Sequence, residues 1–169
     1  MTSIPSFFLE GSNLFSKFEV PEGIEGIEFQ AFYGALMTEV ELPESLYSIG
    51  REAFAATKNI SSIILPENCI GLDEGAFRKS ALQKIDLTPV ISVGRECFQG
   101  CESLEKVIIG PRITALSDGI FADCPKLKTL TLPKSLNRIS SWALDNAQIK
   151  KLVIENPDIN IGADAFRDV

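Results

Sequence analysis

Small and large apolar residues recur along this chain at a nearly constant interval. An adjacent pair, most often alanine followed by phenylalanine, appears seven times. The pairs are Ala31-Phe32, Ala53-Phe54, Ala76-Phe77, Cys97-Phe98, Ile120-Phe121, Ala143-Leu144 and Ala165-Phe166. Their second members lie 22, 23, 21, 23, 23 and 22 residues apart. A fixed period of roughly 20–50 residues is typical of proteins built from stacked coils, so the pattern predicts a solenoid.

Within each repeat, apolar and polar residues alternate over a short stretch that follows the phenylalanine. Ile63 and Leu65 show this two-residue period, which predicts a strand with one buried face. Proline has no amide hydrogen and ends such a strand cleanly. It follows the strand at Pro21, Pro43, Pro66 and Pro133, and one residue later at Pro89 and Pro111. A repeat is therefore predicted to contain a strand, a proline turn, a short extended piece, and a helical or 3₁₀ turn that carries the phenylalanine.

No single coil of this kind buries its apolar face alone, so the coils must stack to form a core. Stacking places equivalent residues of successive coils in one column. We therefore expect a buried column that contains Phe54, Phe77, Phe98 and Phe121.

The repeat can be written L-x-x-I-x-L-P-x-S-L-x-x-I-G-x-x-A-F-x-x-C, and residues 45–54 follow it almost letter for letter. This pattern resembles the BspA-like leucine-rich repeats of bacterial surface proteins and some protists. The resemblance covers roughly residues 15–169. The departures are Thr88 at a proline position, Leu144 at a phenylalanine position, and a cysteine column filled only at Cys101 and Cys124. The resemblance implies ligand-binding or adhesive roles, and the family has no shared catalytic residues to transfer.

The predicted fold class is an α/β solenoid. It is a right-handed leucine-rich-repeat superhelix of about seven coils of 21–23 residues. A parallel sheet is expected on the concave face and short 3₁₀/α turns on the convex face. Residues 15–169 are expected to form the solenoid and residues 1–14 a degenerate N-terminal coil or cap, all within one structural domain.

Charge and hydropathy exclude several classes of partner. The net charge of the 169 residues is −7, which disfavours general nucleic-acid binding. Residues 1–74 carry −9 and residues 75–169 carry +2, so the stack is electrically polarised along its axis. No stretch approaches the ~20 apolar residues of a membrane helix. The apolar run from Ile4 to Leu9 is too short for a signal peptide, which favours a cytoplasmic protein, with a cell-surface or secreted location as the alternative.

Four cysteines and no histidine limit the available chemistry. Cys69, Cys97, Cys101 and Cys124 all align with interior columns and are expected to be buried, reduced and not metal-bound. Without histidine the common general base and the usual nucleophilic triads are missing. We therefore expect no enzyme activity, no catalytic residue, no metal site and no cofactor.

The outward residues of the predicted strands form the candidate binding surface. Two neighbouring columns combine lysines with β-branched apolar residues and, near the N-terminus, with acidic residues. The candidate residues are Lys84, Lys106, Lys151, Ile64, Ile108, Val153, Glu39 and Glu41, with Trp142 and Tyr47 as weaker candidates. The alternative is that β-branched residues simply suit strands and that lysines keep the sheet soluble.

The sequence thus predicts a non-catalytic protein–protein interaction module that binds a protein partner through the concave sheet. It leaves the identity of the partner open and favours a monomer. Two alternatives remain at this point. One is a ligand-binding fragment of a larger cell-surface adhesion protein, and the other is a self-associating structural repeat.

Overall fold

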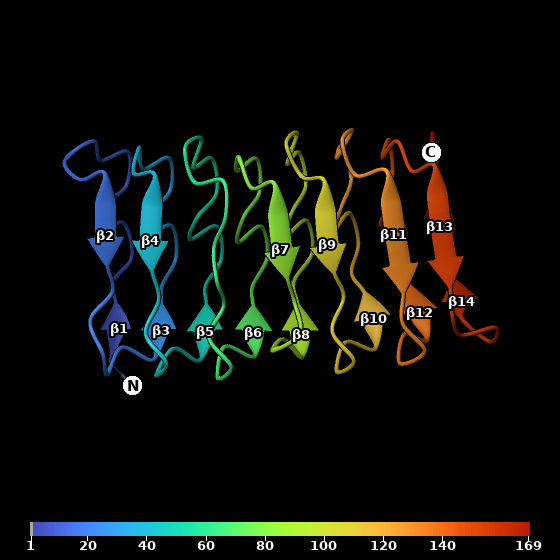
Figure 1. Cartoon of the computed structure of the whole chain (residues 1–169), viewed down its shortest axis with the longest axis horizontal. Coiled ribbons are helices and arrows are strands. Elements are labelled where there is room, and N and C mark those ends of the chain that lie inside the picture. The colour runs from blue at the N-terminus through green and yellow to red at the C-terminus, as the bar shows by residue number, and fades with distance from the viewer. Residues whose placement is uncertain (1) are drawn as a thin grey trace.

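The computed structural model describes residues 2–169, which form a stack of about seven coils with fourteen short strands (Figure 1). Each coil lies beside the preceding one, so β1 (Ser3–Ile4) and β2 (Lys17–Glu19) stand at one end. β13 (Lys151–Ile154) and β14 (Asn160–Ile161) stand at the other end. The predicted solenoid is confirmed, and its strands pair in parallel.

The longer strands lie side by side on one face, which we call the long-strand face. After β2 it contains β4 (Glu39–Glu41), β7 (Lys84–Asp86), β9 (Lys106–Ile108), β11 (Thr129–Leu132) and finally β13. Parallel ladders join β2 to β4, β7 to β9, and β11 to β13. Between β4 and β7 the third coil contributes only a single bridge, from Ser62 to Lys84. The predicted sheet is therefore present in three separate pairs.

The short extended pieces pair as well and form a second parallel face. After β1 its strands are β3 (Gly26–Ile27), β5 (Ser48–Ile49), β6 (Gly71–Leu72), β8 (Ser92–Val93), β10 (Ala115–Leu116), β12 (Arg138–Ile139) and finally β14. They form one sheet in the order β1-β3-β5-β6-β8 and another in the order β10-β12-β14. Strands of two residues show no alternation of their own, so sequence periodicity could not predict this pairing.

The phenylalanine-bearing segments are turns, and residues 2–169 contain no helix. The prediction of 3₁₀/α segments here was wrong, and the hydrogen bonds give the reason. In the second complete turn the amides of Glu52, Phe54 and Ala56 donate to carbonyls of the next coil, at 3.0, 2.8 and 2.8 Å. Because these alternate amides donate to the neighbouring coil, they are not available for the hydrogen bonds of a helix within the turn.

Backbone geometry at two positions of each turn also opposes a helix. Both positions have positive φ, near +50° to +70°, which is left-handed backbone. One column contains Gln30, Glu52, Gly75, Glu96, Gly119, Trp142 and Asp164, and the other contains Gly34, Ala56, Lys79, Gly100, Asp123, Asn146 and Asp168. Left-handed residues reverse the direction of the chain, so they fold each turn tightly enough to rejoin the stack.

The core runs along the stack axis, and the predicted phenylalanine column is confirmed. The rings of Phe54, Phe77, Phe98 and Phe121 are almost completely buried. Successive ring centroids lie 5.5, 5.5 and 5.6 Å apart with nearly parallel planes. The column supports both strand faces and fixes the positions of their outward side chains.

Candidate functional site

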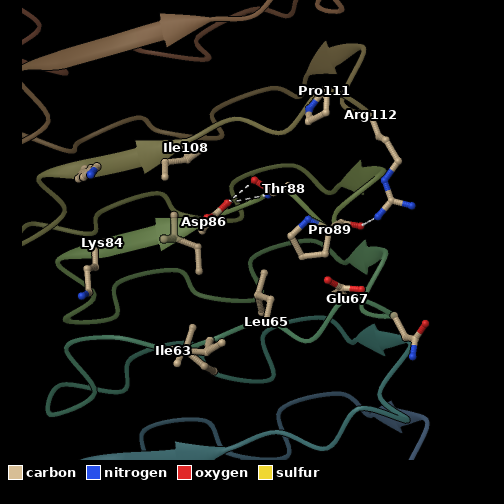
Figure 2. Close-up of a pocket in the computed structure, with 14 residues that line it drawn as sticks. Ile63, Leu65, Glu67, Lys84, Asp86, Thr88, Pro89, Ile108, Pro111 and Arg112 are labelled. Carbon is tan, nitrogen blue, oxygen red and sulfur yellow. Dashed lines mark hydrogen bonds between the residues drawn. The ribbon is translucent and has the colours of Figure 1, made fainter.

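A hollow lies on the long-strand face, across the third, fourth and fifth coils (Figure 2). Its volume is about 820 Å³. Side chains of β7 and β9 line one part, and the proline turns that follow these strands line another. Four of the residues that the sequence pointed to, Ile64, Lys84, Lys106 and Ile108, line this one hollow.

Two exposed isoleucines give the hollow its apolar surface. Ile64 is 86% exposed and Ile108 is 41% exposed, although both are large hydrophobic residues. Strand alternation explains this, because Ile63 and Leu65 point into the core and force Ile64 outward. Fully burying an exposed side chain of this size is favourable by roughly 1.5–3 kcal/mol, and Ile108, which is already more than half buried, would gain less.

Two lysines stand beside these isoleucines. Lys84 and Lys106 are direct partners in the β7–β9 ladder, which places their strands about 4.8 Å apart. Within residues 2–169 neither ammonium lies within ion-pairing distance of a carboxylate. Asp86 is the nearest acidic residue along β7, and its Oδ1 accepts hydrogen bonds from the Thr88 amide and hydroxyl at 2.9 and 2.6 Å. Neither lysine of this pair therefore has an ion-pair partner among the described residues.

The turn side of the hollow contains residues that sequence reasoning missed. Arg112 and Glu67 line it, and Arg112 donates a hydrogen bond to the Pro89 carbonyl. A signal for Arg112 was present, because the preceding Pro111, like Pro89, lies one residue later than the prolines of other coils. The segment between the end of the strand and the proline is therefore one residue longer after β7 and β9.

The other predicted residues lie apart from the hollow. Lys151 and Val153 are on β13, separated from β9 by β11, and both are exposed. Glu39 and Glu41 are on β4 at the opposite side, where they surround Lys17. The predicted surface is thus divided into a central hollow and two peripheral parts.

Lys17 partly compensates the predicted acidic patch. Its Nζ lies 2.6, 3.2 and 3.9 Å from carboxylate oxygens of Glu41, Glu19 and Glu39. The hydrogen bond that Lys17 donates to the Glu41 carboxylate is the main cause that raises the pKa of Lys17 above its ordinary value. These carboxylates already have an internal partner, so they offer less to an external cation than the sequence suggested.

The weaker candidates are exposed but isolated from the hollow. Trp142 lies in the turn that carries Leu144 and is about half exposed. Its backbone is left-handed, at φ 55°. It borders a second hollow of about 440 Å³ with Arg95, Asp118 and Arg167. Its column is not uniformly solvent-facing, because Glu52, Gly75 and Gly119 of the same column are buried. Tyr47 is also about half exposed.

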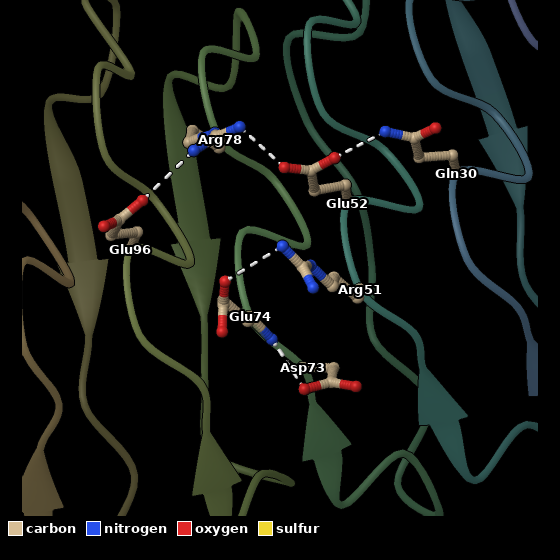
Figure 3. A network of polar contacts seen from close by, with 7 residues as sticks. All are labelled: Gln30, Arg51, Glu52, Asp73, Glu74, Arg78 and Glu96. Atoms are coloured by element: carbon tan, nitrogen blue, oxygen red, sulfur yellow. Dashed lines mark hydrogen bonds and ion pairs between the residues drawn. The ribbon is translucent and has the colours of Figure 1, made fainter.

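A row of polar contacts links the phenylalanine-bearing turns of four successive coils (Figure 3). Gln30 donates to Glu52 at 2.5 Å, and Arg78 pairs with Glu52 at 2.6 Å and with Glu96 at 3.1 Å. The Glu52 side chain is only 12% exposed. Each of these four side chains has a partner on an adjacent coil, so the contacts stabilise the stack.

We expect Arg78→Ala to reduce the free energy of unfolding by about 1–2 kcal/mol, because it leaves the nearly buried Glu52 carboxylate with only Gln30. Urea unfolding measures this loss. Arg51→Ala is the matched control, since it removes an exposed pair to Glu74 at 3.4 Å and should cost under about 0.5 kcal/mol. Equal losses in both variants would contradict the structural role of the Glu52 contact.

All four cysteines are buried and unbridged, which confirms their predicted interior positions. Burial raises the pKa of the Cys69 thiol to about 12 and that of Cys101 to about 11. Burial also raises the pKa of Cys97 and Cys124 well above the ordinary value. Because the thiolate is the reactive form, these groups are inert at neutral pH.

A thiol reagent should therefore label none of the cysteines quickly at neutral pH and all four in denaturant. Intact-mass spectrometry of timed samples measures the number of adducts. Fast labelling of Cys101 or Cys124 in the folded protein would show that their column opens to solvent.

Residues 2–169 contain no group of three or more cysteine or acidic side chains placed to hold a metal ion. Among the same residues no helix is long and apolar enough to cross a membrane.

Comparison with protein families agrees with this geometry. The family described as "BspA type Leucine rich repeat region" matches in six copies, over residues 2–93 and 50–169. The chain therefore belongs to the BspA-type leucine-rich-repeat family, as the sequence pattern predicted. No curated protein matches it.

Several solved structures have a similar fold. A leucine-rich repeat protein from Bacteroides ovatus is 25% identical with a TM-score of 0.88, and the match covers 96% of this chain and 43% of that one. A leucine-rich repeat protein from Eubacterium ventriosum is 18% identical with a TM-score of 0.64, over 90% and 42% of the two chains. The T. pallidum leucine-rich repeat protein TpLRR is 20% identical with a TM-score of 0.59, over 96% and 67%. This chain thus spans less than half the length of the first two.

Proposed function

We propose that this protein is a non-catalytic interaction module that binds a protein partner at the hollow of the long-strand face. The observation that carries the proposal is the convergence of Ile64, Ile108, Lys84 and Lys106 in that hollow. Family membership supports the broader role, because leucine-rich repeats stack to present an extended surface of side chains.

The chemistry of the hollow defines the partner surface that fits it. The isoleucines are suited to a large apolar side chain, and the lysines to carboxylates beside it. Lys84 and Lys106 repel one another across the ladder, which is mildly destabilising. An acidic partner relieves that repulsion, so the preferred partner segment combines an apolar residue with neighbouring Asp or Glu.

The volume of about 820 Å³ suits a few side chains rather than a whole domain. An extended partner segment that crosses the third to fifth coils would place its apolar residue between Ile64 and Ile108. The charged contacts would act mainly on association rate and specificity and would weaken as salt rises.

Selection from a random peptide library displayed on phage tests this function. We expect enrichment of peptides with a large apolar residue flanked by acids. Lys84→Glu/Lys106→Glu should weaken their binding by roughly ten-fold or more. Lys79→Glu/Lys134→Glu makes the same charge change away from the hollow and should leave binding nearly intact.

A second variant separates the apolar contact from the charge. Ile64→Ser should leave the unfolding free energy almost unchanged, since Ile64 is 86% exposed, and should still abolish most of the binding. Titration calorimetry with a selected peptide measures the affinity, and circular dichroism checks the fold. Unchanged affinity in both hollow variants would overturn the proposed site.

A further inference from the structure

The hollow that Trp142 borders lies over the phenylalanine-bearing turns, and we call it the Trp142 hollow. Its volume is about 440 Å³. Trp142, Gly119 and Glu96 occupy the same column of the repeat in three successive coils, and all three line the hollow. Because Gly119 has no side chain, it leaves a gap in the column. A tryptophan therefore lies on one side of this gap and an acidic residue on the other.

The coil that carries Trp142 is covered on both sides by other coils. On its C-terminal side the amides of Leu144 and Asn146 donate to carbonyls of the next coil, each at 2.9 Å. Most of the hollow lies on the other side of Trp142, over the turns that carry Phe98 and Phe121. The exposure of Trp142 to this hollow is therefore a property of inner coils.

Folding of the coil does not favour a tryptophan at this position. Trp142 has left-handed backbone, at φ 55°, which bulky side chains rarely adopt. The other residues of the column are glycine or polar residues, and glycine fits such backbone without strain. Trp142 is also 47% exposed, so much of its ring packs against no protein atom. An exposed aromatic surface in a hollow is suited to contact a ligand.

The hollow also contains charged groups of both signs that are not paired with each other. Among the described residues neither the Asp118 carboxylate nor the Arg95 guanidinium has an ion-pair partner. Gln99 adds an amide beside them. The Asp145 carboxylate, by contrast, accepts two hydrogen bonds from Arg167, at 3.0 and 2.7 Å. Asp118 and Arg95 are thus the groups that a ligand can engage.

This combination of groups defines the class of ligand. A cation is attracted by Trp142 and Asp118, but it meets the positive charges of Arg95 and Arg167. An anion meets the opposite conflict. A neutral sugar ring avoids both, because its C–H face packs on an aromatic ring and each hydroxyl both donates and accepts hydrogen bonds.

We propose that the Trp142 hollow binds a neutral sugar ring, with the C–H face of the sugar on Trp142 and its hydroxyls bonded to Asp118 and Arg95. The volume of about 440 Å³ is near the lower end of the range for ligand pockets, roughly 300–1,000 Å³, and suits one or two sugar rings. The site lies away from the hollow of the long-strand face. This inference therefore goes beyond the proposed function and is independent of it.

Tryptophan fluorescence tests the site directly, because Trp142 is the only tryptophan of the chain. The probes are the methyl glycosides of glucose, galactose, mannose, fucose and N-acetylglucosamine. We expect at least one of them to shift the emission to shorter wavelength with saturation, since the sugar excludes water from the ring. Methylguanidinium chloride and sodium acetate are the charged probes and should cause no saturable shift. A shift with a charged probe alone, or with no probe, overturns the proposal.

Trp142→Gly separates binding from folding. We expect it to abolish binding of the glycoside that shifts the emission, as titration calorimetry would show. The free energy of unfolding should stay the same or rise, because glycine suits left-handed backbone. Tyr47→Ser is the matched control, since it removes another half-exposed aromatic residue outside the hollow and should leave binding intact. Binding that survives Trp142→Gly overturns the proposal.

Polar variants that keep Trp142 test the hydrogen bonds to the sugar. Asp118→Asn and Arg95→Gln should each raise the dissociation constant of the glycoside roughly ten-fold, because each replaces a charged hydrogen-bonding group by a neutral one. Asp158→Asn makes the same change outside the hollow and should have no effect. Gly119→Gln fills the gap and should abolish binding. Unchanged affinity in Asp118→Asn, Arg95→Gln and Gly119→Gln overturns the assignment of the site.

Discussion

Replacing Phe98 with alanine should lower the free energy of unfolding by about 3–5 kcal/mol, the largest single effect that we expect in this protein. Phe98 is fully buried between Phe77 and Phe121, at ring centroid distances of 5.5 and 5.6 Å. Its amide and those of its neighbours hold adjacent coils at fixed spacing through hydrogen bonds. The surrounding coils therefore resist collapse into the space that the ring leaves.

Urea denaturation followed by circular dichroism measures this loss. Leu14→Ala is the control, since Leu14 is exposed near the N-terminal end and its truncation leaves no cavity. We expect the control to change stability by less than about 0.5 kcal/mol. Similar stabilities for the Phe98 variant and the unmodified chain would contradict a rigid core column.

Replacing Gly94 with alanine should cost about 3 kcal/mol, because the added methyl group has no space. A Cβ at this position would lie 2.4 Å from the Glu74 nitrogen and 2.5 Å from the Asp73 carbonyl carbon. Both are backbone atoms of the adjacent coil, so relief requires a shift between coils. This close approach gives a physical reason for the glycine in the I-G step of the repeat.

Gly71→Ala is a matched control on the same short-strand face. Its added Cβ would meet only side-chain atoms, at 3.7 Å from Ser92 and 3.8 Å from Ser48, which is ordinary contact. Thermal unfolding of both variants measures the difference. Equal melting temperatures would show that the coils near Gly94 move apart at little cost.

Sequence by itself determined the features that depend on the repeat. Phenylalanine spacing gave the number of coils and the buried column, and alternation around Ile63 and Leu65 gave the outward direction of Ile64. These features are periodic, and every coil repeats the same evidence. The positions of the four cysteines followed from the same alignment.

Other features were decided only by contacts between coils. The turns around Phe54 are not helical because alternate amides donate to the next coil, which no local propensity encodes. Short strands such as β5 and β6 exist only because each pairs with its neighbour.

The candidate site shows the same division. Alternation along single strands predicted that Ile64, Lys84, Lys106 and Ile108 point outward. Their exposure in the structure confirms this prediction. Their meeting in one hollow, with Arg112 beside them, depends on the turns after β7 and β9. The partial compensation of Glu39 and Glu41 by Lys17 depends on side chains from adjacent strands. A one-dimensional pattern specifies which way a residue points, whereas its neighbours are set by how one coil lies on the next.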